Sequence, residues 1–206
     1  MGVGNVRRKL IDHIKQYWVI YLSLSCVYLA GIIFGSIGVG ALNEPEGSQL
    51  VKFFDSLISN QPVELDQQFL IQLARDNFIM MALIWILGLT IIGTPLIYLI
   101  VFTRGFVLGF TISFIVGAKG AFGLGLVVIT VVAPAILGIP MLLLGAGLAT
   151  IFSFLLLRGK TTGESLRREF MYYSVATAIV SLGSVAVGVT QGYFSLLGVH
   201  LFGLGI

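Results

Sequence analysis

The residues that could do chemistry in this 206-residue chain are few and far apart. The two histidines, His13 and His200, are near opposite ends, and Cys26, the one cysteine, lies inside an apolar run. The chain has no HExxH motif, and the pair Gly88 and Gly93 lacks the lysine of a phosphate-binding loop. We therefore predict no catalytic residue, no metal site and no cofactor-binding site.

Serine and threonine are the remaining possible nucleophiles. They are spread along the apolar segments, at Ser23, Ser25, Thr90, Thr111, Ser113, Thr130, Thr150, Ser153, Thr177, Ser181, Ser184 and Thr190. A serine needs an adjacent base to become a nucleophile, and we find no ionisable residue near the middle of any predicted span. We expect these hydroxyls to bond to the backbone or across helices.

The composition identifies the protein class. Hydrophobic residues make up 57% of the chain and charged residues only 10%, whereas soluble domains carry about 25% charged residues. We predict an all-α, polytopic membrane helix bundle that forms a single integral membrane domain over residues 1–206. The net charge of +3 is explained by basic residues on the cytoplasmic side, so we predict no nucleic-acid binding.

Five apolar stretches predict five transmembrane helices, at 17–41, 78–101, 105–118, 137–157 and 171–194. Arg104 falls at the boundary between the second and the third. Pro134 and Pro140 predict one broken helix, with a short segment at 123–133 before the break. Broken helices at membrane depth are buried in protein or face water, so this break is either a packed kink or a site.

The charges predict the orientation of the chain. The tail 1–16, the boundary 102–104 and the loop 158–170 hold most of the lysines and arginines, so we place them in the cytoplasm, with the N-terminus inside and the C-terminus outside. A rival topology makes 105–133 a re-entrant hairpin. It would put the basic loop outside, which the same rule disfavours.

Residues 43–77 form the longest polar segment, which this orientation makes extracytoplasmic. Apolar residues recur in it at helical spacing, including Phe53, Phe54 and Leu57. We predict two amphipathic helices at about 47–75 on the outer surface. They either form a lid over the spans or dock a partner.

Three glycine pairs have the GxxxG spacing that lets membrane helices approach closely. They are Gly31 with Gly35, Gly105 with Gly109, and Gly188 with Gly192. The spacing is compatible with packing inside one bundle and with a homodimer. We take Gly31, Gly35, Gly105 and Gly109 as candidate partner-binding positions, together with Phe53, Phe54 and Leu57.

Several segments resemble the stage II sporulation protein M family. The clearest is WILGLTIIGTPLIYLIVFTRGFVLGFTISFIV at Trp85–Val116. The others are YLAGIIFGSIGVGAL at Tyr28–Leu42, LVKFFDSLIS at Leu50–Ser59, and APAILGIP followed by GAGLATIFSFLLLR. The resemblance runs from about Arg8 to Phe194. Many relatives have a more polar residue after the first proline of the break, where this chain has Ala135.

This resemblance implies a multi-pass protein of the bacterial cell membrane, located at the sporulation septum. It implies a non-enzymatic scaffold of the machinery that degrades septal peptidoglycan during engulfment. The partners would be membrane lipid and the stage II sporulation proteins D and P, which are single-span peptidoglycan hydrolases. The alternative is a transporter or channel for a small neutral or lipidic solute, which the lack of midplane charges disfavours. An intramembrane enzyme ranks third, because no acid–base pair is found.

Overall fold

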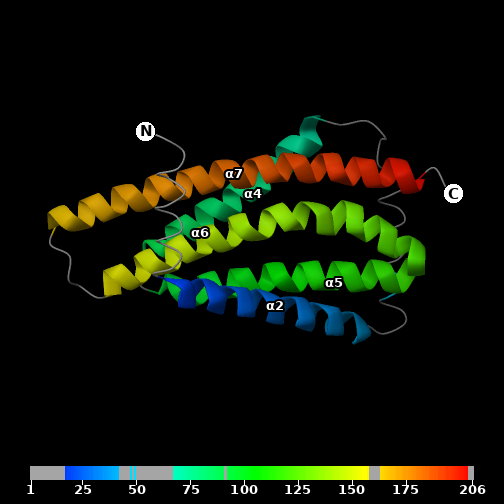
Figure 1. Cartoon of the computed structure of the whole chain (residues 1–206), viewed down its shortest axis with the longest axis horizontal. Coiled ribbons are helices and arrows are strands. Elements are labelled where there is room, and N and C mark those ends of the chain that lie inside the picture. Colours follow the sequence, from blue (N-terminus) through cyan, green and yellow to red (C-terminus); the bar gives the residue numbers. More distant parts are fainter. Residues whose placement is uncertain are drawn as a thin grey trace.

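A computed structural model describes residues 17–41, 47, 49, 67–90, 92–157 and 163–203. These residues are helical apart from short turns, and no strand occurs among them. The helices are α2 (Trp18–Gly40), α4 (Gln67–Gly88), α5 (Gly93–Val127), the π-helical turn η1 (Val128–Val132), α6 (Ala133–Leu157) and α7 (Gly163–Gly203) (Figure 1). The predicted all-α class is confirmed.

Four helices are long and apolar enough to cross a membrane: Trp18–Gly40, Gln67–Gly88, Gly93–Leu157 and Leu166–Ser195. Their outer surfaces carry large apolar side chains such as Phe34, Ile37 and Leu182. An apolar surface of this kind is stable in lipid and unfavourable in water. The chain is therefore consistent with a multi-pass membrane protein, while the predicted count of five spans and the orientation remain predictions.

The 65-residue stretch Gly93–Leu157 folds back on itself at one glycine. Gly120 has φ 58° and ψ −136°, and it is the one positive-φ residue among those described. Glycine adopts this region without a steric penalty because it has no Cβ. As a result, α5 and α6 lie side by side and run in opposite directions (Figure 1).

The predicted break near Pro134 and Pro140 is wrong. The chain is helical across both prolines, and Pro140 lies inside α6. A proline has no N–H and its ring clashes with the carbonyl four residues earlier. Here η1 ends just before Pro134, and the Ala133 N–H is bonded to the Val128 carbonyl. This π-turn shifts the hydrogen-bond register of the helix at the position where Pro134 must be accommodated.

The predicted boundary between the second and third spans is also wrong. The helix ends at Gly88 and a new one begins at Gly93, so the predicted span 78–101 is divided. Pro95 lies in the first turn of α5, where the missing N–H costs nothing because that position has no intrahelical acceptor. Arg104 is therefore not in a loop, and it lies well inside α5.

Several predictions fall outside the described residues. These are the tail 1–16, most of the outer segment 43–77 and residues 158–162. The part of the predicted amphipathic segment that the structure describes, from Gln67 onward, is continuous with α4. The remaining part of the predicted loop, from Gly163 onward, is continuous with α7.

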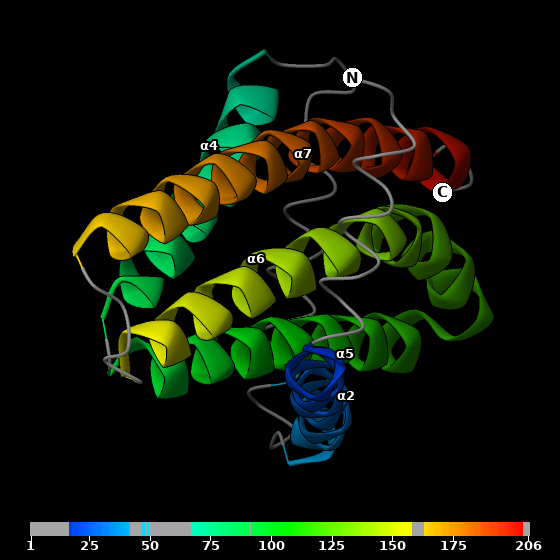
Figure 2. The ribbon, with the colours of Figure 1, turned by 60° about the vertical axis from the view of Figure 1, so that its left-hand side comes forward.

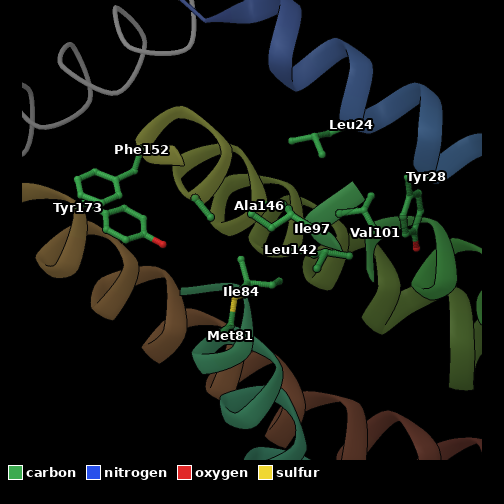
Figure 3. Packing of buried hydrophobic residues seen from close by; sticks show 11 residues of the cluster. Leu24, Tyr28, Met81, Ile84, Ile97, Val101, Leu142, Ala146, Phe152 and Tyr173 are labelled. Atoms are coloured by element: carbon green, nitrogen blue, oxygen red, sulfur yellow. The ribbon is translucent and has the colours of Figure 1, made fainter. Parts of the chain in front are cut away.

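Helix α6 is the centre of the bundle and contacts α2, α4, α5 and α7. Figure 2 shows α2 and α5 on one side of it and α4 with α7 on the other. The main core contains side chains from all five helices, packed around Leu142 and Ala146 (Figure 3). This arrangement gives α5 two different surroundings, one facing α2 and one facing α4.

Candidate functional site on helix α5

The first face of α5 is a glycine contact with α2. An added Cβ at Gly31 would overlap the carbonyl oxygen of Phe102, and one at Gly105 would overlap that of Tyr28. Gly35 and Gly109 make the equivalent close approaches one turn further along. The two GxxxG pairs therefore lie against each other, with backbone touching backbone.

Side chains reinforce this contact. The hydroxyls of Ser23 and Tyr98 are 2.5 Å apart, and the Ser36 hydroxyl donates to the Gly109 carbonyl at 3.4 Å. Hydroxyl bonds between membrane helices contribute modestly to their association. They also fix the register of the two helices, which run parallel.

These observations bear on the predicted partner-binding glycines. Gly31, Gly35 and Gly105 are buried, and their neighbours belong to the same chain. Of the two interpretations of GxxxG, packing within one bundle accounts for all four glycines on α2 and α5. A partner could reach these positions only by separating the two helices. The other candidate positions, Phe53, Phe54 and Leu57, lie outside the described residues.

The second face of α5 carries Arg104, which is exposed. Its depth follows from the register with α2, because Arg104 lies between the contacts made by Tyr98 and by Gly109. Their partners are close to the two ends of α2, so Arg104 is level with the middle of that helix. It also lies about 17 Å along α5 from Gly93, compared with about 15 Å for half of an apolar bilayer core.

Asp76 on α4 lies at a similar level. Its neighbour Asn77 accepts a hydrogen bond from Ser184 at 3.4 Å, and Ser184 is near the middle of the apolar stretch of α7. Asp76 is about 18 Å along α4 from Gly88. Since α4 ends at Gly88 and α5 begins at Gly93, Asp76 and Arg104 lie at matching distances from the point where the two helices diverge.

Asp76 and Arg104 carry opposite charges and attract each other through space. Among the described residues they form no direct ion pair with each other. The preceding residue, Arg75, has its Nε 4.0 Å from an Asp76 carboxylate oxygen, and more than half of each side chain is exposed. We call these three residues, Arg75, Asp76 and Arg104, the charged cluster.

The charged cluster was not expected from the sequence, which placed Arg104 at a boundary between spans, whereas Arg104 lies well inside helix α5. A charge at the centre of a membrane costs about 2.5–3.5 kcal/mol on insertion scales, and such residues usually mark functional sites. Gln68 and Gln72 are exposed on the N-terminal half of α4, two turns and one turn before Arg75 and Asp76. Together they form a polar stripe that descends to the charged cluster and stops there.

One signal in the sequence could have revealed this cluster. Arg104 directly precedes Gly105, the first glycine of a GxxxG pair. Pro95, the first proline after Gly88, fits the start of a helix as well as a kink. A helix beginning near Gly93 would have placed Arg104 in mid-span. The uninterrupted apolar run from Phe78 to Val101 concealed that start.

Hydrogen bonds hold the end of the bundle at which α4 ends and α5 begins. Ser153 of α6 donates to the Thr90 carbonyl at 2.8 Å and accepts from Thr94 at 2.9 Å. The Tyr173 hydroxyl donates to the Trp85 carbonyl at 3.0 Å. For Thr90, which donates to the Leu87 carbonyl, and for Ser153, the prediction that hydroxyls bond to the backbone or across helices is confirmed. The turn from which α4 and α5 diverge is thus held in place.

The described residues contain no group of three or more His, Cys, Asp or Glu side chains arranged to hold a metal ion. The Thr150 hydroxyl is fully buried without a hydrogen-bond partner. The charged cluster is accordingly the most distinctive polar feature of the part of the bundle that the structure describes.

Comparison with known proteins adds one finding. The model of the family described as stage II sporulation protein M matches residues 24–202, which includes every described helix except the first turns of α2 and the last residue of α7. No curated protein and no solved structure gives a match.

Proposed function

We propose that this chain, which belongs to the stage II sporulation protein M family, is a non-enzymatic scaffold of the engulfment machinery in endospore formation. The family makes it a sporulation-related membrane protein. The observation that carries the proposal is the family match over nearly the whole chain. The scaffold would recruit or regulate the stage II sporulation proteins D and P, whose peptidoglycan hydrolysis thins the septal wall.

Five membrane crossings with the N-terminus in the cytoplasm are part of the proposal. The Gly93–Leu157 stretch would be about 98 Å long as one straight helix, roughly three times the apolar thickness of a bilayer. Its reversal at Gly120 supports two crossings. The starts of α2, α5 and α7 and the ends of α4 and α6 then share one side (Figure 1).

The distribution of basic residues supports this orientation even without Arg104. Eight of the 12 lysines and arginines flank the proposed cytoplasmic ends: Arg7, Arg8, Lys9, Lys15, Arg158, Lys160, Arg167 and Arg168. Single-cysteine variants in a Cys26→Ser background test it. A cysteine at Lys160 should react with a membrane-impermeant maleimide only after the cells are opened, whereas reaction in intact cells would reverse the orientation.

The partner proposal is tested by co-purification. The full chain carrying a tag is expressed with proteins D and P in one bacterial membrane, extracted in mild detergent and recovered by the tag. We expect both hydrolases to be retained. A chain that recovers neither hydrolase, although it is folded and monodisperse, would contradict the scaffold role.

A transporter or channel is the second candidate, and one observation favours it. The charged cluster puts ionisable groups at mid-span, where transport pathways often have them. The polar stripe, however, runs along only the outer half of α4, and the inner half of the same face is apolar. Flux of a solute into liposomes that contain the purified chain, lost on Arg104→Leu, would replace the scaffold proposal with this one.

A further inference from the structure

Two adjacent arginines stand on the first turns of α7, at the end of the bundle where α4 ends. Arg167 and Arg168 are both exposed, and the helix that carries them continues unbroken to Gly203. The ion pair found among the described residues joins Arg75 to Asp76, so neither Arg167 nor Arg168 has a carboxylate partner there. Both guanidinium groups are available to a ligand.

Aromatic rings fix this part of α7 against its neighbours. The ring of Phe170 is 6.5 Å from that of Trp85 on α4 and 6.2 Å from that of Phe152 on α6. Phe152 also stacks on Tyr173, with 4.5 Å between the ring centroids. Because residues three apart share a helix face, Arg167 lies on the same side of α7 as Phe170, the side that packs against the end of α4.

The exposed residues along α7 show how deep the two arginines lie. Met171 and Tyr172 are 59% and 67% exposed, and exposed apolar side chains continue with Val175 and Ile179, so this helix enters the lipid at about Tyr172. Arg168 is about 6 Å before Tyr172 along the helix. The headgroup layer is about 5–7 Å thick on each side of the apolar core. The guanidinium groups therefore lie at the level of the lipid phosphates.

The neighbouring segments of the chain have the same sign of charge. The tail 1–16 holds four basic residues and one acidic residue, and residues 158–170 hold four basic and two acidic residues. The more acidic segment 42–66 joins the end of α2 to the start of α4, at the opposite end of the bundle from the start of α7 (Figure 1). The balancing negative charge is therefore expected from the surroundings of the chain.

The depth and the charge together specify a lipid as the occupant. Phospholipid phosphates surround a membrane protein at headgroup level, and basic groups between transmembrane helices bind anionic headgroups. An arginine can donate two parallel hydrogen bonds to one phosphate, which a lysine cannot do. An acidic segment of another protein would reach the same two arginines only by displacing lipid from them.

We propose that Arg167 and Arg168 bind the phosphate headgroup of an anionic phospholipid between the start of α7 and the end of α4. The guanidinium groups would hold the phosphate, and the acyl chains would lie along the exposed apolar side chains of α7 that begin at Met171. This inference goes beyond the scaffold role and does not depend on it, because lipid surrounds the bundle whichever partners it holds.

The test uses Trp85 as a reporter, because its ring contacts that of Phe170, one turn from Arg167. Trp18→Phe leaves Trp85 as the one tryptophan of the full chain, which is reconstituted in phosphatidylcholine vesicles. Its fluorescence is quenched by brominated lipid in contact with it. We expect brominated phosphatidylglycerol to be favoured over brominated phosphatidylcholine with the same acyl chains by about threefold or more.

Variants then locate the lipid. Arg167→Gln with Arg168→Gln should abolish the preference for phosphatidylglycerol, whereas Arg167→Lys with Arg168→Lys should keep part of it, because lysine retains the charge without the planar fork. The matched control is Arg75→Gln with Lys119→Gln, which removes two positive charges elsewhere and should keep the full preference.

A second reporter separates a local site from a general effect of charge. In a Trp85→Phe chain the remaining tryptophan is Trp18 on α2, and α2 and α7 lie on opposite sides of α6 (Figure 2). Quenching of Trp18 by the two lipids should be unchanged by Arg167→Gln with Arg168→Gln.

Three outcomes would overturn the proposal. The first is equal quenching of Trp85 by both lipids in the chain with both arginines. The second is an equal loss of preference in the two variants that each remove two positive charges. The third is a preference that millimolar inorganic phosphate abolishes, which would assign the arginines to a free anion. None of these measurements uses proteins D and P, so the scaffold role is judged separately by their recovery.

Discussion

The two faces of helix α5 use adjacent residues in opposite ways. Because Gly105 lets the backbone of α2 come into contact, that face of α5 is covered by another helix of the same chain. Arg104, one position earlier and about 100° around the helix, is left exposed at the same depth. The comparison teaches that the surface a membrane helix uses for its own fold is not the surface that remains for a partner.

The sharpest way to break this comparison is to enlarge the glycine face. Gly35→Leu would drive a side chain into the Phe106 carbonyl, and such overpacking costs about 3 kcal/mol or more when backbone blocks it. We expect the folded, monodisperse fraction in detergent to fall sharply. The matched control is Gly117→Leu on α5, since nothing lies within 4 Å of an added Cβ there.

The glycine contact would be wrong if Gly35→Leu and Gly117→Leu unfolded at the same concentration of sodium dodecyl sulfate. Gly31 and Gly35 could then still serve a partner, as the spacing alone allows. A loss confined to Gly35→Leu would confirm that the motif is occupied inside the chain.

The charged face should respond in the opposite direction. Arg104→Leu removes a charge from mid-span and should stabilise the isolated chain by about 1–3 kcal/mol, by the insertion cost of arginine less its interaction with Asp76. Unfolding of the purified chain in mixed micelles measures this change. A destabilised Arg104→Leu variant would indicate that the guanidinium is needed for the fold itself.

A further prediction concerns Asp76. Asp76→Asn removes the carboxylate that lies beside Arg75 and attracts Arg104, so we expect a loss of stability of about 0.5 kcal/mol, within the range of exposed ion pairs. In the Arg104→Leu background, Asp76→Asn should cost less than it does in the native chain. An equal cost of Asp76→Asn in both backgrounds would mean that the two groups do not interact.

A similarly small effect is expected from the hydroxyl bond between α2 and α5. Tyr98→Phe should cost about 0.6 kcal/mol, the average for side-chain hydrogen bonds in a membrane bundle. Ser23→Ala should give the same loss, and the double variant no more than either one. A loss as large as that of Gly35→Leu would show that side-chain bonds, and not glycine packing, hold the two helices.

The sequence predicted the class of fold and the close approach at the GxxxG pairs because these depend on composition and on local spacing. It did not identify which helices the glycines join, since Gly31 and Gly105 meet only in the folded bundle. It also misplaced two turns. Pro134 and Pro140 were interpreted as a break, whereas a π-turn accommodates the first and a glycine at position 120 makes the reversal.

The charged cluster escaped prediction for a related reason. The apolar run from Phe78 to Val101 has the length of one span, so Arg104 was assigned to a loop after it. The chain instead divides that run between Gly88 and Gly93, where Ser153 bonds to Thr90 and to Thr94. These are tertiary contacts, which no local pattern reveals.

The most direct test is the depth of position 104 in a bilayer. A nitroxide on Arg104→Cys in a Cys26→Ser chain is measured by its relative exposure to oxygen and to a water-soluble nickel complex. The account predicts the oxygen-rich signature of the bilayer centre, clearly deeper than a label at Lys119. A label at headgroup depth would contradict it, because Arg104 would then lie at the end of a span.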